Sequence, residues 1–199
     1  MRNVKSGSSF TLEEKSGASL LRLSSSDGTN LLSADLVKAL TKALEERSQR
    51  NRPLVIAGSD RFFSAGADLR EILALGGPIA CEFSRMGQTL MQTIARFPAP
   101  VYAAISGYCM GGGLDLALAC GYRIASPNAV FGHRGAAFGL ITGWGGTQRL
   151  PRLVGPGHAL EMFTTAKTLP APEALRIGLV DAIVDDPVAE ALHRISRTS

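Results

Sequence analysis

Two short, uninterrupted apolar runs, each followed by a loop and then a helical pattern, restrict the fold of this chain more than any other feature. They are Leu54–Ala57, behind Pro53, and Val101–Ile105, behind Pro100. Continuous apolar runs of about four to eight residues are typical of strands buried on both faces, as in parallel sheets. Because strand, loop and helix alternate along the chain, the sequence indicates a layered α/β fold.

The remaining segments fit the same scheme. Residues 8–14 and 18–24 alternate around Ser16-Gly17 and predict a hairpin. Further elements are predicted as helices over 33–46 (capped by Ser33), 79–95, 114–120, 145–163 (with a break at Gly155-Pro156-Gly157), 172–177 and 188–197, and as strands over 122–125 and 179–184.

Charge and composition exclude several classes of function. The 199 residues suit one domain, and the net charge of +4 comes from Lys and Arg that are scattered along the chain. Aromatic residues make up only 6% of the chain, so a nucleic-acid surface built on base stacking is not expected. No apolar stretch is long enough to span a membrane, and the N-terminus lacks the apolar core of a signal peptide.

The cysteines indicate a reduced compartment. Cys81, Cys109 and Cys120 are odd in number and form no Cys-x-x-Cys pair, so neither a disulfide framework nor a zinc site is expected. The three histidines show no ligand spacing either, and no metal site is predicted. A cytoplasmic protein is the resulting expectation.

The first loop with chemical interest is Phe62–Leu69. Four small residues, Ser64 to Ala67, follow the first buried strand and would let a ligand touch the backbone. Asp68 stands where it could cap a helix that runs through Arg70. The simpler alternative is a strand-to-helix turn without any ligand.

The second loop is Gly107–Leu116, in which Gly111, Gly112 and Gly113 open an apolar helix. Unhindered N–H groups at the positive end of a helix can hold a developing oxyanion. Asp115 lies just inside this helix, where a carboxylate is costly unless it is paired or used. The alternative is that Asp115 only complements the helix dipole.

Together these loops resemble the crotonase superfamily, the enoyl-CoA hydratases and isomerases. The resemblance is carried by residues 63–69, 107–120, 123–126, 131–132, 139–141 and 145–155, in the family's order over roughly residues 50–185. It implies a spiral of ββα units around a central, mostly parallel sheet, and an acyl-CoA thioester as substrate. Coenzyme A would enter as part of that substrate, with no permanently bound cofactor.

The resemblance also implies roles for single residues. The backbone N–H groups of Ala67 and Gly112 would form the oxyanion hole around the thioester carbonyl, with Asp115 as acid or base. Ala65, Asp68 and Arg70 would bind coenzyme A, Ala65 through its carbonyl at the adenine and Arg70 near the phosphates. The acyl pocket is predicted from Tyr108, His133, Phe138 and Trp144, each of which core packing would explain equally well.

The departures from the family pattern concern the reaction. Typical hydratases carry one Glu at the position of Asp115 and a second at the position of Gly135, which has no side chain. Other branches place a carboxylate near Thr142 or Gly143, which are equally uncharged. Hydration needs one group for water and one for the α-proton, so proton transfer of the isomerase type is favoured over efficient hydration. His133 and Arg134 are the nearby polar candidates for the vacant role.

The length of the chain predicts how its C-terminal part is organised. Residues 1–185 would form the acyl-CoA-binding core, and residues 186–199 a short helix in place of the longer C-terminal helical segment of the family. A trimer or hexamer is expected from the resemblance. Two other functions stay open: a catalytically weak acyl-CoA-binding protein that has lost the second acid, and a polynucleotide-binding member, which only the basic charge favours.

Overall fold

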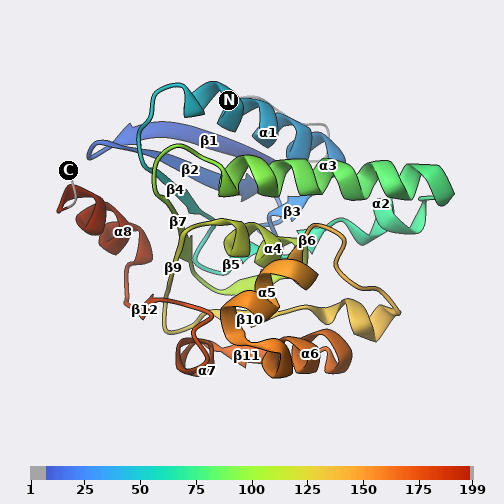
Figure 1. Ribbon diagram of the computed structural model, residues 1–199. Coiled ribbons are helices and arrows are strands. Elements are labelled where there is room, and N and C mark those ends of the chain that lie inside the picture. Colours follow the sequence, from blue (N-terminus) through green and yellow to red (C-terminus); the bar gives the residue numbers. More distant parts are fainter. Residues whose placement is uncertain (1–7, 198–199) are drawn as a thin grey trace.

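A six-stranded sheet forms the centre of the computed structural model, which describes residues 8–197 (Figure 1). Its strand order is β1-β2-β4-β7-β9-β12, and only the β1–β2 hairpin is antiparallel. The predicted hairpin and the mostly parallel central sheet are therefore confirmed. The strands are β1 Ser8–Lys15, β2 Ala18–Ser25, β4 Leu54–Ala57, β7 Val101–Ile105, β9 Tyr122–Ala125 and β12 Ala182–Ile183.

A second, smaller sheet was not predicted. It has the order β11-β10-β8-β5, and β3 pairs with β6 beside it. Strands of two or three residues show no periodicity that a sequence could reveal. Since β7, β8 and helix α4, then β9, β10 and helix α5, repeat one ββα unit, the chain forms the expected spiral. The short strands are β3 Leu31–Leu32, β5 Phe62–Ser64, β6 Gly66–Ala67, β8 Tyr108–Met110, β10 Val130–Gly132 and β11 Thr168–Pro170.

Most predicted helices are confirmed within a few residues. Ser33 caps the first helix, and the helical pattern over 145–163 divides into two helices at Gly155, as the break predicted. Asp68 accepts the N–H of Arg70 as the cap of α2. The helices are α1 Ala34–Ser48, α2 Leu69–Leu73, α3 Gly77–Ala95, α4 Gly112–Ala119, the 3₁₀ helix η1 Arg134–Phe138, α5 Gly146–Val154, α6 Pro156–Thr165, α7 Ala171–Arg176 and α8 Pro187–Ser196.

The central sheet is covered on both faces, which explains its continuous apolar runs. In β4, Leu54 and Ile56 pack into the core that α1 and α3 cover, whereas Val55 and Ala57 face the opposite side. There Ala191, Leu192 and Ile195 of α8 pack against the strands. Figure 1 shows α8 on the other side of the sheet from α1 and α3.

The C-terminal segment is therefore part of the packing. The expected boundary between residues 185 and 186 does not divide the core, because α8 closes one face of the sheet. The predicted closing strand over 179–184 is shorter than expected. Only Ala182 and Ile183 pair with β9, while Leu179 and Val180 already lie buried in the main core.

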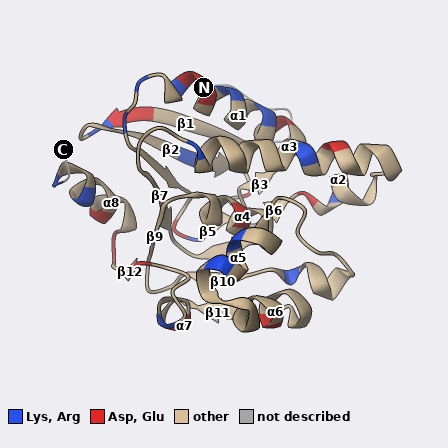
Figure 2. Ribbon diagram, in the orientation of Figure 1, with Lys and Arg blue, Asp and Glu red and all other residues tan. Residues whose placement is uncertain are grey.

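Basic residues are spread over several helices. Figure 2 shows Lys and Arg distributed over α1, α3, α5 and α8 rather than gathered on one element. Within residues 8–197, no helix has the length and apolar character that crossing a membrane requires.

Candidate active site

Three loops meet where parallel strands of the second sheet end. β5, β8 and β10 are parallel neighbours, so their carboxyl ends lie at one edge of the sheet. Ala65 to Ala67 follow β5, Gly111 and Gly112 follow β8, and His133 follows β10. Ligands of α/β proteins bind at this edge because the loops there converge. A cavity of about 500 Å³ opens among these three loops.

The backbone N–H groups of Ala67 and Gly112 lie close together. A Cβ built on Gly112 would stand 3.2 Å from the nitrogen of Ala67, and one on Gly66 would stand 2.9 Å from the nitrogen of Gly112. Gly112 is the first residue of α4, so its N–H has no acceptor inside the helix, and no side chain caps this end. Both residues line the cavity, as an oxyanion hole requires.

Asp115 lies on the first turn of α4 with its carboxylate almost completely buried, at 1% exposure, beside the cavity. The hydroxyl of Thr142 donates a hydrogen bond to Oδ2. Burial raises the pKa of Asp115 to about 7, although the hydroxyl of Thr142, the charge of Arg149 and two backbone N–H groups act in the opposite direction. A carboxyl group with such a pKa can both take up and release a proton near neutral pH.

Gly146, the first residue of α5, makes room for this carboxylate. A Cβ on Gly146 would come within 2.1 Å of Asp115 Oδ1. No other residue fits there without moving the buried acid, so the glycine is required by a close approach and not by its backbone angles. The pattern Gly145-Gly146-Thr147 does not by itself indicate which neighbour requires the glycine.

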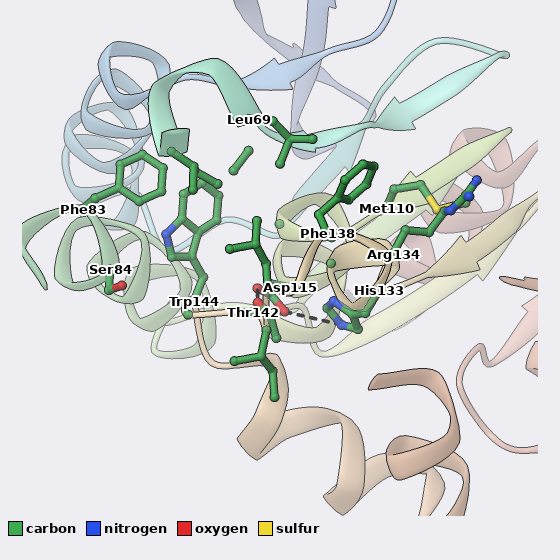
Figure 3. A pocket seen from close by; sticks show the side chains of 18 of the residues that line it. Leu69, Phe83, Ser84, Met110, Asp115, His133, Arg134, Phe138, Thr142 and Trp144 are labelled. Atoms are coloured by element: carbon green, nitrogen blue, oxygen red, sulfur yellow. Dashed lines mark hydrogen bonds and ion pairs between the residues drawn. The ribbon is translucent and has the colours of Figure 1, made fainter. Parts of the chain in front are cut away.

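His133 is a titratable residue that faces Asp115. Its Nε2 lies 3.6 Å from Asp115 Oδ1, and the imidazole is 4% exposed (Figure 3). Burial lowers the pKa of His133 to about 4, so the ring is neutral at physiological pH. The prediction placed His133 in the acyl pocket, and the structure places it at the cavity wall beside the acid.

The other walls of the cavity are mainly apolar. Trp144 is buried against Phe83, with ring centroids 5.4 Å apart, and Phe138 faces the cavity from η1 (Figure 3). Both were predicted. Tyr108 was predicted as well but does not line the cavity: it is 44% exposed and its ring lies on Phe62, because Tyr108 begins β8 and the cavity opens at the carboxyl end of that strand.

The three residues expected to bind coenzyme A lie at or beside the cavity. Ala65 lines it, and Asp68 is buried at the start of α2, where it pairs with Arg70 at 2.8 Å. The side chain of Arg70 is 82% exposed, so its charge reaches solvent, and Arg70 directly follows Leu69, which lines the cavity. The Arg70 side chain, which donates to Asp68, lowers the pKa of that carboxyl group.

Position 135, where a second carboxylate is expected to be missing, lies at the cavity as well. Gly135 lines it, and a Cβ there would stand 2.7 Å from the carbonyl oxygen of Leu140. Gly143 also lines the cavity, and among the described residues Asp115 is the only acidic side chain that does so. One carboxylate, not two, is therefore available.

Sequence reasoning missed several residues of the site. Thr142, which hydrogen-bonds to Asp115, was considered only as the position of a missing acid. The apolar lining residues Leu69, Ile72, Met110, Ile141 and Phe163 were not singled out, because nothing in their spacing separates a cavity wall from a core.

Comparisons with known proteins agree on one family. The family model for enoyl-CoA hydratase/isomerase matches residues 13–197. A crotonyl-CoA hydratase of Syntrophomonas wolfei is 47% identical over 132 residues, which are 66% of this chain and 51% of that protein. A probable enoyl-CoA hydratase of Bacillus subtilis is 43% identical over 168 residues, 83% of this chain and 65% of that protein.

A solved structure gives the same result for the fold. The enoyl-CoA hydratase of Thermoplasma volcanium superposes with a TM-score of 0.89 at 34% identity, covering 95% of this chain and 76% of that one. The matched segments span between about half and two thirds of the length of the two curated relatives.

Proposed function

The chain belongs to the enoyl-CoA hydratase/isomerase family, and on that premise we propose that it is an enzyme that processes acyl-CoA thioesters. The N–H groups of Ala67 and Gly112 hold the thioester oxygen, and Asp115 is the group that exchanges a proton with the acyl chain. One observation carries the proposal: a buried carboxyl group with a pKa near 7 stands in the same cavity as two adjacent backbone donors.

The chemistry follows from this pairing. Removing a proton next to a thioester leaves an enolate, whose charge collects on the carbonyl oxygen. Preorganised N–H donors aimed at that oxygen stabilise it more than they stabilise the substrate, which is what lowers the barrier. The apolar cavity holds the acyl chain, while Ala65, Asp68 and Arg70 at its opening bind the coenzyme A part.

The single carboxylate favours isomerisation over hydration. Moving a double bond needs one group that takes a proton at one carbon and returns it at another, whereas adding water also requires activation of that water. The alternative is an acyl-CoA-binding protein with little activity, which the uncharged Gly135 and Gly143 would favour. The resemblance to the family supports a trimer or hexamer, and the three free cysteines support a location in the cytoplasm.

The test compares wild type with Asp115→Asn. Each is incubated with crotonyl-CoA and with a 3-enoyl-CoA while the absorbance of the 2-enoyl thioester is followed. We expect faster turnover of the 3-enoyl substrate, and a loss of about a hundredfold or more in Asp115→Asn with coenzyme A binding retained. Binding without turnover of either substrate by wild type would instead support the alternative.

A matched pair of substitutions tests whether Gly135 stands where the second carboxylate is missing. Gly135→Glu and Gly135→Gln have nearly the same shape and meet the Leu140 carbonyl in the same way, so both strain the loop equally. Only Glu supplies a second carboxylate, so we expect it to hydrate crotonyl-CoA about tenfold faster than Gln does. Equal rates would contradict the assignment of Gly135 to the missing acid.

A further inference from the structure

Two buried polar atoms face each other at the cavity without a hydrogen-bond partner. They are Oδ1 of Asp115 and Nε2 of His133, 3.6 Å apart, and neither makes a hydrogen bond of normal geometry within the described residues, although the backbone N–H groups of Trp144 and Gly146 lie near the carboxylate. Buried polar atoms nearly always have a hydrogen-bond partner, so two such atoms that face each other without one require an explanation. A separation slightly longer than a hydrogen bond is common at catalytic sites before a ligand binds.

The surroundings hold both groups in this orientation. Thr142 occupies the other carboxylate oxygen, Oδ2, and the absence of a side chain at Gly146 leaves Oδ1 its space. The imidazole of His133 lies against the ring of Phe163, with centroids 5.0 Å apart. Figure 3 shows the imidazole turned toward the carboxylate across the floor of the cavity.

We propose that His133 is a second acid/base residue of this site, and that it forms one proton-carrying pair with Asp115 through the facing Nε2 and Oδ1 atoms. The proposal rests on the proposed function, because it assumes an acyl thioester in the cavity. It gives the site a second titratable group although position 135 lacks one.

Access to the carboxylate is the reason that the imidazole is needed. Oδ1 of Asp115 is fully buried and Oδ2 is held by Thr142, so the proton that Asp115 exchanges with the acyl chain passes through a neighbouring group at the cavity wall. His133 lines the cavity. Its Nδ1 has no hydrogen-bond partner among the described residues, and unlike Nε2 it is not one of the fully buried unpartnered atoms. Nδ1 is therefore the atom of the pair that a substrate can reach.

The pair has two states that differ by one proton. In the first, Asp115 is ionised and Nε2–H of His133 donates to Oδ1, which leaves Nδ1 free to accept a proton. In the second, the carboxyl O–H donates to Nε2 and Nδ1 carries the other proton. Because the carboxyl pKa is raised above that of the imidazole, the proton rests on Asp115 and no buried imidazolium persists.

Three other titratable groups lie near the pair. Arg149 on α5 is positively charged and favours the ionised carboxylate, while Cys109 on β8 is a buried thiol whose pKa is raised well above its usual value. Arg134 on η1 follows His133 directly and is exposed. The raised pKa keeps the Cys109 thiol protonated near neutral pH, so this thiol does not contribute to a titration there.

The step balances without any further reactant. The Cα–H bond of a 3-enoyl thioester breaks, its proton goes to Nδ1, and its electron pair moves to the thioester oxygen, while the Nε2 proton moves to Oδ1. In the return step Nδ1–H gives its proton to the γ-carbon, the dienolate electrons form the γ-carbon–hydrogen bond and the α,β double bond, and Oδ1–H returns its proton to Nε2.

The decisive measurement is made on the wild-type protein by nuclear magnetic resonance of ¹⁵N-labelled histidine. We expect His133 to change from the Nε2–H to the Nδ1–H tautomer as the pH falls from about 9 to 5.5, with a midpoint near 7. In Asp115→Asn this change should disappear. His133→Gln assigns the signals among the three histidines. A single tautomer throughout, or an unchanged transition in Asp115→Asn, would overturn the proposal.

Steady-state kinetics provide a second test of the role of His133. With the 3-enoyl substrate, His133→Gln should lower kcat by about a hundredfold and leave KM within about threefold. His193→Gln, the same change on α8 at an exposed ion pair with Glu190, should match wild type. An active wild type together with equal activity in His133→Gln would reject the role of His133. An inactive wild type that still shows the tautomer change would reject the proposed function and support the pair.

Discussion

At the scale of single residues, burial shifts the pKa values of Asp115 and His133 in opposite directions. The pKa of Asp115 is raised from 3.8 to about 7, and that of His133 is lowered from 6.5 to about 4, in both cases because burial disfavours the charged form. The two shifts have opposite consequences for stability, since the folded protein holds extra protons on one group and fewer on the other.

Each pKa shift changes the free energy of unfolding over its own pH range. Between pH 3.8 and about 7 the folded state keeps a proton on Asp115 that the unfolded chain has lost, so this contribution to stability is lost as the pH rises. Between about pH 4 and 6.5 the unfolded chain binds a proton at His133 that the folded state does not, so this contribution grows as the pH rises. In the wild type the two contributions largely cancel.

We therefore expect the free energy of unfolding to change with pH in opposite directions in two variants. It should fall with rising pH in His133→Gln and rise in Asp115→Asn, by at most about 1.4 kcal/mol per pH unit in each case. Urea titrations between pH 4 and 6.5 measure this. All other groups are common to both variants, so parallel curves would show that these two residues do not titrate as the geometry implies.

At the scale of elements, Trp144 fixes the loop before α5 against two helices. A Cβ built on Gly87 of α3 would stand 2.2 Å from the indole, and one on Gly112 of α4 would stand 2.6 Å from its other edge. Both glycines therefore leave the space that the indole fills. The wall of the cavity depends on this contact, because Trp144 lies beside the oxyanion-hole residue Gly112.

Adding one methyl group to α3 at this point should loosen the site. We expect Gly87→Ala to lower the free energy of unfolding by about 1–3 kcal/mol, as overpacking does. Trp144 is the only tryptophan in the chain, so its fluorescence emission should shift to longer wavelength as the ring moves.

The same helix offers the control. Gly77, the first residue of α3, has nothing within 4 Å of a built Cβ, so Gly77→Ala should change stability by less than about 1 kcal/mol and leave the emission unchanged. Equal effects of the two substitutions would mean that helix propensity, and not contact with Trp144, determines the result.

At the scale of the whole molecule, two apolar cores share the central sheet. The larger one, beneath α1 and α3, reaches through α4 to the cavity, and the smaller one lies under α8. The four interior strands β2, β4, β7 and β9 contribute to both cores because their side chains alternate. The site lies at the edge of the second sheet and contacts the larger core. The central sheet forms one side of that core, and α8 covers the opposite face of the same sheet.

Removing side-chain volume from α8 should destabilise the entire fold. We expect Ile195→Ala to lower the free energy of unfolding by about 2–4 kcal/mol in urea, because Ile195 is buried in the smaller core. Ile79→Ala on α3, where the side chain is 58% exposed, should cost less than about 0.5 kcal/mol. A small loss at Ile195 would show that α8 is not needed to close the sheet.

The sequence by itself determined the parts of this protein that depend on neighbouring residues. The runs Leu54–Ala57 and Val101–Ile105 specify strands buried on both faces, Ser33 and Asp68 start helices, and the glycines after β8 open α4. Each follows from a periodicity or a local hydrogen bond that lies within a few residues, and the ordered motifs were sufficient to identify the family.

Only the tertiary structure decided which of these residues share a site. Asp115 meets Thr142, 27 residues later, and His133, 18 residues later, because parallel strands bring the ends of distant segments to one edge of a sheet. Tyr108 lies outside the cavity because it begins β8, where its ring packs on Phe62, while the cavity opens at the other end of the strand. Such contacts depend on packing between segments, which local patterns do not encode, and here they set the protonation of the acid on which the proposed chemistry depends.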